Sequence, residues 1–456
     1  MIERKHRRPI GFYERQFVVR NIGNFYTSFN VTGKYRGTRR ITPNVLSRAL
    51  KKLIRDSNYW LVYNFYRTHS YKSDKEYDGT NFEVRPLESL NYNDAVKCMS
   101  VQSFDNSVLK MFNDLRPEMN SPTLALWMVY LIESSSDKRQ YVSLVCDHAL
   151  LDGVSGSKFH KDLMEALNLQ DEYCEMQQTL FSYEDEKDYL GDSLIGPVEQ
   201  LTGLFQPNFS TIIGHFASTF KDMLTYKWTN SPVSESVFAH NVITKEMTTD
   251  YQIVNFAPSE LSKMLEFCRR NKITLTPFIH IIALKLLEKR FLPSQFQDIY
   301  GCLVSLINIF KPSQLLLNSD DEWLSLMKDF HQEIIDDLSS LDSFKEKGLV
   351  KYTNVWNSQE AKIGKREGRQ TLLTSNIGML KLPKPTCFGF TLEDVIFSSS
   401  TCGRYHFILD VAASEIGGLN VVFAYLPEYS KIVYPDGTRA MDNLIAEFKS
   451  RCSTIK

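Results

Sequence analysis

Residues Tyr141 to Leu163 read YVSLVCDHALLDGVSGSKFHKDL, and this stretch decides the fold. Its first eight residues alternate between two faces, as a β-strand requires. The face that ends at His148 is apolar and consists of Val142, Leu144 and Cys146. Asp152-Gly153 then gives a strong turn signal, because glycine accepts positive φ at little cost. The stretch predicts a strand, a turn and a histidine at the strand end.

A helix is expected after the turn, since apolar residues recur at helical spacing at Phe159, Leu163, Ala166 and Leu167. Ser155 or Ser157 is expected to cap it. Two interpretations of His148 stay open at this point. It is either a core histidine or a group that takes a proton from an alcohol or amine, because its ordinary pKa of about 6.5 suits work near neutrality.

The composition restricts the class of protein. A chain of 456 residues is long enough for two or more domains. Its 53 basic residues nearly balance its 54 acidic residues, which argues against a nucleic-acid partner held by a basic surface. The eight cysteines form no Cys-x-x-Cys pair, so we expect reduced thiols in a cytoplasmic setting, with neither disulfides nor a metal site.

The N-terminal segment allows two interpretations. It lacks the apolar core of a signal peptide, and the chain has no run of 18 apolar residues, which favours an intracellular protein without a spanning helix. The six basic residues from Arg4 to Arg20 exceed the two acidic residues Glu3 and Glu14 by four, and aromatic and aliphatic residues lie among them. Such a segment either rests on a membrane surface, at the endoplasmic reticulum or a lipid droplet, or packs as a first helix with a solvated leader.

Helix and strand signals alternate in both halves of the chain, which predicts an α/β fold. Helices are expected from about 43 to 54 and at Ser259–Arg270, Thr276–Lys289 and Ala440–Arg451. Strands are expected at Ser28–Tyr35, Tyr59–Tyr66, Thr123–Ile132, Tyr141–Asp147, Gly301–Ile309, Thr371–Ile377, Asp394–Ser399, Phe407–Ala413 and Leu419–Ala424. Residues 196–235, with an amphipathic segment at Phe209–Leu224, read as a crossover between an N-terminal lobe of residues 1–195 and a C-terminal lobe of residues 236–456.

The segment His148-Ala-Leu-Leu-Asp152-Gly153 and its preceding strand resemble the active-site motif of the chloramphenicol-acetyltransferase-like superfamily. The fungal alcohol acetyltransferase family is the most similar group. Further segments resemble it in the same order, namely GFYERQF near the N-terminus, TLTPFIHIIALKLL at Thr274–Leu287, LTSNIGML at Leu373–Leu380 and GGLNVVFAY at Gly417–Tyr425. Many relatives carry a second histidine before the first, and here that position is Asp147. Strand alternation predicts that Asp147 points away from His148.

The resemblance implies two lobes of mixed sheet and helices with an active-site tunnel between them. It implies that His148 is the general base and that the acceptor attacks acetyl-CoA directly, without a metal or a covalent enzyme intermediate. Asp152 would hold the loop through a salt bridge with an unidentified basic residue. Gly153 would leave space beside His148. For Asp152 and Gly153 the alternative is an ordinary turn.

Two further groups of candidate residues follow from the resemblance. Ser375 and Asn376 match the family's Ser-Asn-(Ile/Leu)-Gly segment and are candidate donors to the thioester oxyanion, or else they stabilise a strand end. The basic loop of Lys362, Lys365, Arg366 and Arg369 either binds the phosphates of acetyl-CoA or is a solvated face.

Three functions are compatible with these residues. The first is O-acetylation of an alcohol with acetyl-CoA. The second is N-acetylation of a sphingoid base or a similar lipid amine, which uses the same base. The third is a non-catalytic relative that binds an acyl ligand, against which the intact His148 and Asp152-Gly153 argue. A monomer is expected in each case.

Overall fold

The computed structural model describes residues 2–454 except 27, 57–58, 69–80, 192–193, 215–247, 292–301, 305–306, 310–319, 362, 364–369, 382–388 and 403–404. The chain divides into two compact units. The first comprises Met1–Pro197, Ile377–Ser400 and Val411–Asn420, and the second comprises Val198–Asn376, Thr401–Asp410 and Val421–Lys456. Two late segments therefore belong with the N-terminal part, an interleaving that the predicted linear boundaries at 195 and 235 do not include.

The first unit is built on a five-stranded sheet with the order β14-β2-β8-β7-β6. These strands are β2 (Phe29–Gly37), β6 (Val96–Val101), β7 (Trp127–Ser134), β8 (Arg139–Cys146) and β14 (Phe390–Ser399). β6 pairs with β7 in parallel and the other pairs are antiparallel, so the sheet is mixed. β7 and β8 form an antiparallel hairpin in which Ser134 is paired with Arg139.

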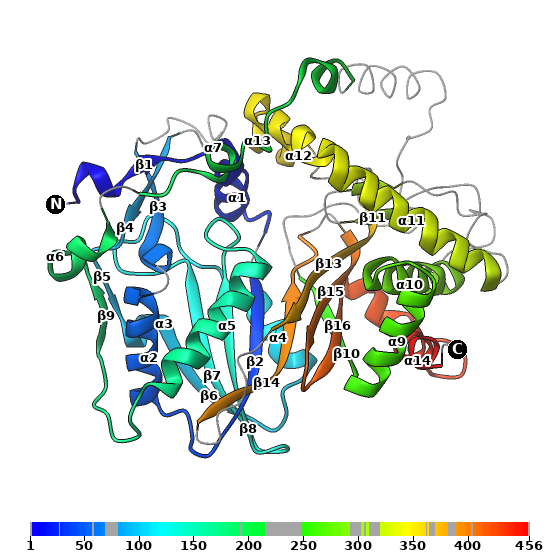
Figure 1. Cartoon of the computed structure of the whole chain (residues 1–456), viewed down its shortest axis with the longest axis horizontal. Coiled ribbons are helices and arrows are strands. Elements are labelled where there is room, and N and C mark those ends of the chain that lie inside the picture. The colour runs from blue at the N-terminus through cyan, green and yellow to red at the C-terminus, as the bar shows by residue number, and fades with distance from the viewer. Residues whose placement is uncertain are drawn as a thin grey trace. The chain divides into compact units, whose positions relative to one another are not determined.

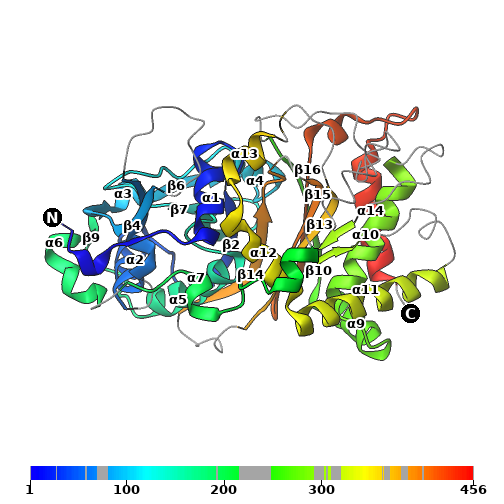
Figure 2. The ribbon, with the colours of Figure 1, turned by 90° about the horizontal axis from the view of Figure 1, so that it is seen from above.

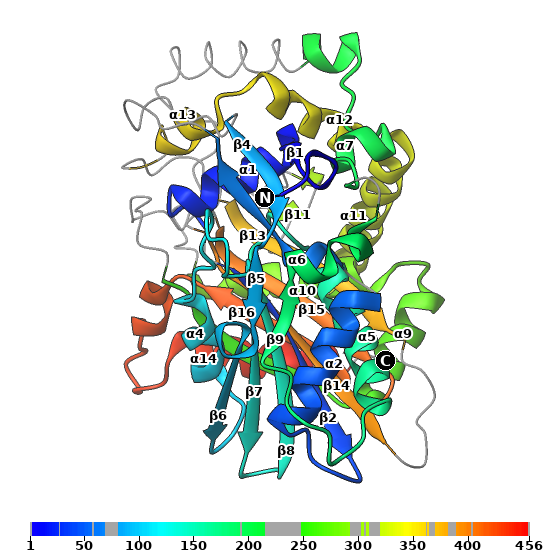
Figure 3. The ribbon, with the colours of Figure 1, turned by 90° about the vertical axis from the view of Figure 1, so that its left-hand side faces the viewer.

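Two helices cover one face of this sheet. α5 (Gly153–Asn168) packs on β2 and β14, and α2 (Pro43–Asp56) packs on α5 (Figures 1 and 3). The unit also contains two small sheets and shorter helices. They are β1 (Arg8–Pro9), β4 (Phe82–Pro86) and β3 (Tyr63–Arg67); β5 (Ser89–Asn91) and β9 (Thr179–Ser182); and α1 (Phe12–Ile22), α3 (Tyr92–Ala95), α4 (Asn106–Asn113) and α6 (Tyr183–Glu186).

The second unit contains most of the sheet β10-β16-β15-β13, and the remaining strand residues are grouped with the first unit. The strands are β10 (Asp250–Phe256), β13 (Gln370–Leu380), β15 (Tyr405–Ser414) and β16 (Gly418–Tyr425). Figure 2 shows α9 (Pro258–Arg270), α10 (Leu275–Phe291) and α14 (Ala440–Ser453) beside this sheet. The remaining elements are α7 (Val198–Thr202), α11 (Asp320–Ser340), α12 (Asp342–Lys347), α13 (Val355–Glu360) and the hairpin β11 (Cys302–Val304) and β12 (Ile307–Ile309).

These elements confirm the predicted α/β class and most of the predicted helices and strands. Three predictions need correction. The strand predicted over Thr123–Ile132 begins only at Trp127. Residues Tyr59–Val62 form a 3-10 helix, so the strand predicted over Tyr59–Tyr66 begins only at Tyr63. The single strand predicted at Gly301–Ile309 is a short hairpin. In the amphipathic segment Phe209–Leu224, the residues from 215 onwards lie outside the described part of the chain. No helix among the described residues is long and apolar enough to cross a membrane.

Candidate active site

His148 lies in a turn that follows the central strand of the first sheet. β8 ends at Cys146, which is paired with Phe29 of β2 on one side and Trp127 of β7 on the other. The Asp147 N–H donates to the Leu126 carbonyl at 2.9 Å, and the Leu150 N–H donates to the Asp147 carbonyl at 3.1 Å. Strand alternation therefore stops before Asp147, and the prediction that placed Asp147 and His148 on opposite strand faces does not apply to a turn.

Asp147 is buried, with 1% of its surface exposed, and its carboxylate binds the turn to α1. It accepts one hydrogen bond from Asn21 Nδ2 at 2.6 Å and one from the Ala149 N–H at 2.7 Å. Burial raises the pKa of Asp147, and the two hydrogen bonds lower it. The effect of burial is the larger, so the pKa is about 6. No interaction between the Asp147 and His148 side chains is found among the residues that the structure describes, so each has its own partners.

Three aromatic rings surround the half-buried His148 imidazole. Phe17 of α1 is stacked on it with ring centroids 5.1 Å apart and an interplanar angle of 21°. Phe29 lies at 4.8 Å and Tyr26 at 5.7 Å, both tilted to the imidazole plane. The rings come from α1 and from the residues that enter β2, so the two segments together fix the plane of the imidazole.

The aromatic surroundings disfavour a charged imidazole. Burial lowers the pKa of His148 to about 4, and the Arg20 charge acts in the same direction. The Asp152 carboxylate and the carbonyl groups of Leu151 and His148 itself raise the pKa and offset part of the effect of burial. His148 is therefore neutral at pH 7, with a nitrogen lone pair available to accept a proton.

Asp152 caps the helix that follows the turn. Its backbone is extended, and its Oδ1 accepts a hydrogen bond from the Ser155 N–H at 2.7 Å, while α5 begins at Gly153. The prediction that Ser155 or Ser157 caps this helix is wrong, since the turn ends earlier than the apolar spacing indicated. Asp152 is exposed, and no basic side chain among the described residues lies within ion-pair distance of it.

Gly153 is buried where α5 meets two strands. A Cβ atom at this position would lie 2.6 Å from Ile377 Cγ2 of β13 and 3.2 Å from Phe397 Cζ of β14. Both distances are shorter than ordinary van der Waals contact, so the neighbouring side chains would have to move. The close approach of α5 to these strands thus requires glycine here, whatever chemistry His148 performs.

The other predicted residues form two groups. Ser375 and Asn376 lie on the part of β13 that belongs to the second unit, where Asn376 Nδ2 donates to Thr276 Oγ1 at 3.0 Å. Lys362, Lys365, Arg366 and Arg369 lie outside the described residues. Two further histidines, His160 and His280, are fully buried.

α1 packs on the first unit through its apolar side. Its Val18 and Val19 are fully buried, and Arg8 donates two hydrogen bonds to Glu14 at 2.6 and 2.7 Å. These contacts favour the packed-helix interpretation of the N-terminal segment. Phe17 and Asn21 are neighbours of the turn that the sequence pattern did not indicate. Their spacing of four residues, which places them on one helix face, was the available signal.

The strand, turn and capped helix around His148 lie among mixed sheets and helices that have the chloramphenicol-acetyltransferase-like fold. A family model described as alcohol acetyltransferase matches residues 9–298 and 288–434. The chain therefore belongs to the alcohol acetyltransferase family.

Individual relatives agree with this assignment. The chain is 25% identical to alcohol O-acetyltransferase 1 of Saccharomyces cerevisiae over 93% of its own length and 91% of the relative. It is 21% identical to alcohol O-acetyltransferase 2 of the same yeast, over 92% and 91% of the two chains. Among solved structures, TRI3 trichothecene 15-O-acetyltransferase from Fusarium sporotrichioides is similar in fold, with a TM-score of 0.62 at 12% identity over 98% of this chain and 95% of that one. The wax ester synthase/diacylglycerol acyltransferase from Marinobacter aquaeolei VT8 has a TM-score of 0.57 at 12% identity over 98% and 100%.

Proposed function

We propose that the protein transfers an acetyl group from acetyl-CoA to the hydroxyl of an alcohol, with His148 as general base. The observation that carries this proposal is a neutral, half-buried imidazole at a strand end, held between aromatic rings. The membership of the alcohol acetyltransferase family supports the acceptor class. Acyltransferases of this family use an acyl-CoA donor, and acetyl is the group that the relatives' names specify.

In the proposed reaction, His148 Nε2 takes the proton of the acceptor hydroxyl while the oxygen attacks the thioester carbonyl carbon. The carbon–sulfur bond then breaks, and the imidazolium returns its proton to the departing CoA sulfur. The imidazole ends neutral, so the enzyme needs no further reactant. A positioned base of this kind contributes roughly 10²–10⁴-fold to the rate.

The surroundings of His148 affect the two charge states differently. The Asp152 carboxylate stabilises the imidazolium that forms during proton transfer, while Arg20 opposes it. In this scheme Asp152 has two roles, because it also caps α5 and so keeps the turn in place.

We further propose Ser375 and Asn376 as donors to the oxyanion. We propose the loop that contains Lys362, Lys365, Arg366 and Arg369 as the site of the CoA phosphates. Peripheral membrane contact stays a prediction.

The test uses purified full-length protein with acetyl-CoA and three acceptors, namely a short alcohol, a long-chain alcohol and a sphingoid base. Free CoA and the acetylated products are measured. Ester formation supports the proposal, and amide as the sole product would instead identify an N-acetyltransferase. The absence of CoA release above blank hydrolysis with every acceptor would support the non-catalytic alternative.

The role of His148 is tested with His148→Ala and His148→Gln, each checked for an unchanged melting curve. We expect a loss of at least 100-fold in kcat/KM. A folded His148→Ala protein that keeps the full rate would refute the assignment of the base.

A further inference from the structure

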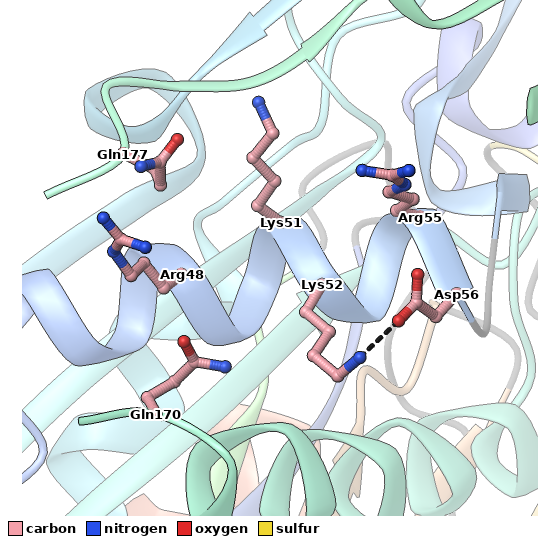
Figure 4. Close-up of a pocket in the computed structure, with 7 residues that line it drawn as sticks. All are labelled: Arg48, Lys51, Lys52, Arg55, Asp56, Gln170 and Gln177. Atoms are coloured by element: carbon pink, nitrogen blue, oxygen red, sulfur yellow. Dashed lines mark hydrogen bonds and ion pairs between the residues drawn. The ribbon is translucent and has the colours of Figure 1, made fainter. Parts of the chain in front are cut away.

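A second surface of the first unit has the chemistry of an anion site. Four basic residues of α2, namely Arg48, Lys51, Lys52 and Arg55, line a hollow of about 470 Å³ (Figure 4). Their spacing of three and four residues places them on one helix face. The segment between α5 and β9 contributes Gln170 and Gln177 to the same hollow.

Packing does not account for this run of like charges. The opposite side of α2 already buries its apolar residues, among them Val45, Leu46 and Leu50. Neighbouring cations at these spacings repel one another and destabilise a helix. Arg48, Lys51 and Lys52 are nevertheless half-buried.

The charges in the hollow are only partly neutralised. Lys52 forms an ion pair with Asp56, the acidic residue of the lining, and Lys51 Nζ lies 3.9 Å from Glu186 outside it. The four cations and one carboxylate of the lining leave a surplus of three positive charges. An occupant with two or more negative charges would complement this surplus.

Both guanidinium groups retain donors for such an occupant. Arg48 donates from Nε to the Glu175 carbonyl at 2.7 Å, and Arg55 lies over the Tyr189 ring at 4.1 Å. Their terminal Nη groups make no hydrogen bond to any residue that the structure describes. The planar guanidinium presents paired N–H groups that match the oxygens of a phosphate in a bidentate way.

The two glutamines add neutral polar groups at the hollow. Gln170 Nε2 donates to the Ala166 carbonyl at 3.0 Å. The side-chain oxygen of Gln170 points toward α2 (Figure 4). The Gln177 side chain has no hydrogen-bond partner among the described residues, because only its backbone N–H is engaged, with Ser47. An amide can orient a phosphate hydroxyl or the group to which the phosphate is attached.

From these contacts we infer that the α2 hollow binds a phosphate-bearing anion, either a free phosphorylated molecule or the headgroup of a phosphorylated lipid. Arg48 and Arg55 bind the phosphate oxygens, and Lys51 supplies a further charge. None of these residues is in contact with the His148 imidazole or its aromatic neighbours, so this site goes beyond the acetyl-transfer proposal and does not depend on it.

The test measures binding of inorganic tripolyphosphate to the full-length protein by calorimetry, at 50 mM and 200 mM KCl. The double variant Arg48→Gln/Arg55→Gln is expected to weaken binding at least ten-fold. The control Lys158→Gln/Lys161→Gln removes the same charge from exposed positions of α5 and is expected to bind within two-fold of the wild type. His148→Ala is expected to bind normally, which separates this result from the acetyl-transfer proposal.

A second arm distinguishes the two sources of phosphate. Flotation with phosphatidylcholine vesicles that contain phosphatidylinositol 4-phosphate, compared with vesicles of equal charge made with phosphatidylserine, tests the lipid headgroup. Selective binding to the phosphoinositide vesicles, lost in Arg48→Gln/Arg55→Gln, supports the lipid source, and tripolyphosphate binding alone supports a free ligand. Equal binding to both vesicle types, no binding to any probe, or an equal loss in the Lys158→Gln/Lys161→Gln control would overturn the inference.

Discussion

Asn21 Nδ2 donates a hydrogen bond of 2.6 Å to Asp147 Oδ2, and this bond joins α1 to the turn that carries His148. One helical turn before Asn21, Phe17 is stacked on the His148 ring. The same amide group also donates to the Pro117 carbonyl at 3.1 Å. Asn21 therefore acts on the imidazole indirectly, through Asp147 in the turn and through Phe17 on the same helix. It is a positioning residue for the proposed base.

Asn21→Ala is the first substitution to test. It removes one of two hydrogen bonds from a buried carboxylate, and we expect a loss of about 1–3 kcal/mol in the free energy of unfolding. Because the turn is then less firmly held, kcat should fall while KM for acetyl-CoA changes less. Urea denaturation and steady-state kinetics provide the two measurements.

Asn93→Ala is the matched control, since Asn93 is exposed. Its unfolding free energy and kcat should both equal those of the wild type. If Asn21→Ala loses stability but keeps its kcat, the bond is structural alone and the positioning role is wrong.

Gly153→Ala tests the contact between α5 and the two strands. Its Cβ would lie 2.6 Å from Ile377 Cγ2, so we expect a loss of about 1–3 kcal/mol in stability and reduced activity. Gly214→Ala is the control, because a Cβ there meets nothing within 4 Å.

The cause can be isolated with a double-mutant cycle. Ile377→Ala removes the methyl group that the new Cβ would meet, so Gly153→Ala should cost less in that background than in the wild type. Equal costs in the two backgrounds would show that the Ile377 contact is not the reason for glycine.

Arg20→Gln tests the electrostatic control of His148. The Arg20 charge lowers the pKa of His148, so its removal should raise that pKa. Proton acceptance needs the neutral imidazole, and the acidic limb of kcat/KM against pH should therefore move to higher pH. Arg20→Lys keeps the charge and should leave the limb in place. A shift of equal size in both variants would point to lost packing on Phe17, over which the guanidinium lies at 5.6 Å.

The stability of the protein should decrease as pH falls through the range of its buried histidines. Burial lowers the pKa of His160 from 6.5 to about 4 and that of His280 to about 3. Between about pH 6.5 and 4 the unfolded chain binds more protons than the folded one. The unfolding free energy therefore decreases as the pH is lowered. Each of these two histidines lowers the unfolding free energy by about 2 kcal/mol when the pH is lowered from 7 to 5. Asp147, whose pKa is raised to about 6, acts in the opposite direction over the same range.

His160→Gln separates this effect from general acid sensitivity. The variant should be less stable at pH 7, because His160 Nε2 lies 2.8 Å from the Val31 carbonyl and Nδ1 lies 3.0 Å from the Tyr35 hydroxyl. Its unfolding free energy should nevertheless change less between pH 7 and 5. Urea unfolding at both pH values gives the comparison, and a pH dependence equal to that of the wild type would contradict the prediction.

Local patterns predicted the segment around His148 well, because alternation and turn chemistry depend on near neighbours. The strand predicted over Tyr141–Asp147 is present as Arg139–Cys146, and the predicted helix is present from Gly153 onwards. The cap was assigned to Ser155 or Ser157 instead of Asp152, since side-chain spacing does not reveal where the backbone changes from extended to helical.

Contacts between distant residues could not be predicted in this way. Asn21 and Asp147 are separated by 126 positions, and no local pattern in either segment indicates the other. The 3-10 helix at Tyr59–Val62 has a similar origin, because Trp60 Nε1 donates to the Leu150 carbonyl and Trp127 Nε1 donates to the Leu61 carbonyl, both at 2.7 Å. These tertiary hydrogen bonds override the strand preference of an aromatic segment.

The pairing of β14 with β2 also has a consequence for how the chain acquires its structure. Asn30 of β2 donates to Ser398 of β14 at 2.6 Å across 368 positions in the sequence. While the chain is being synthesised, β2 therefore has an unpaired edge until almost the whole polypeptide has emerged from the ribosome. Such an edge is a template for aggregation, and non-local strand pairing of this kind is slow. An N-terminal fragment ending before residue 390 should accordingly depend on chaperones, because β14 is the last strand of the first sheet to be made.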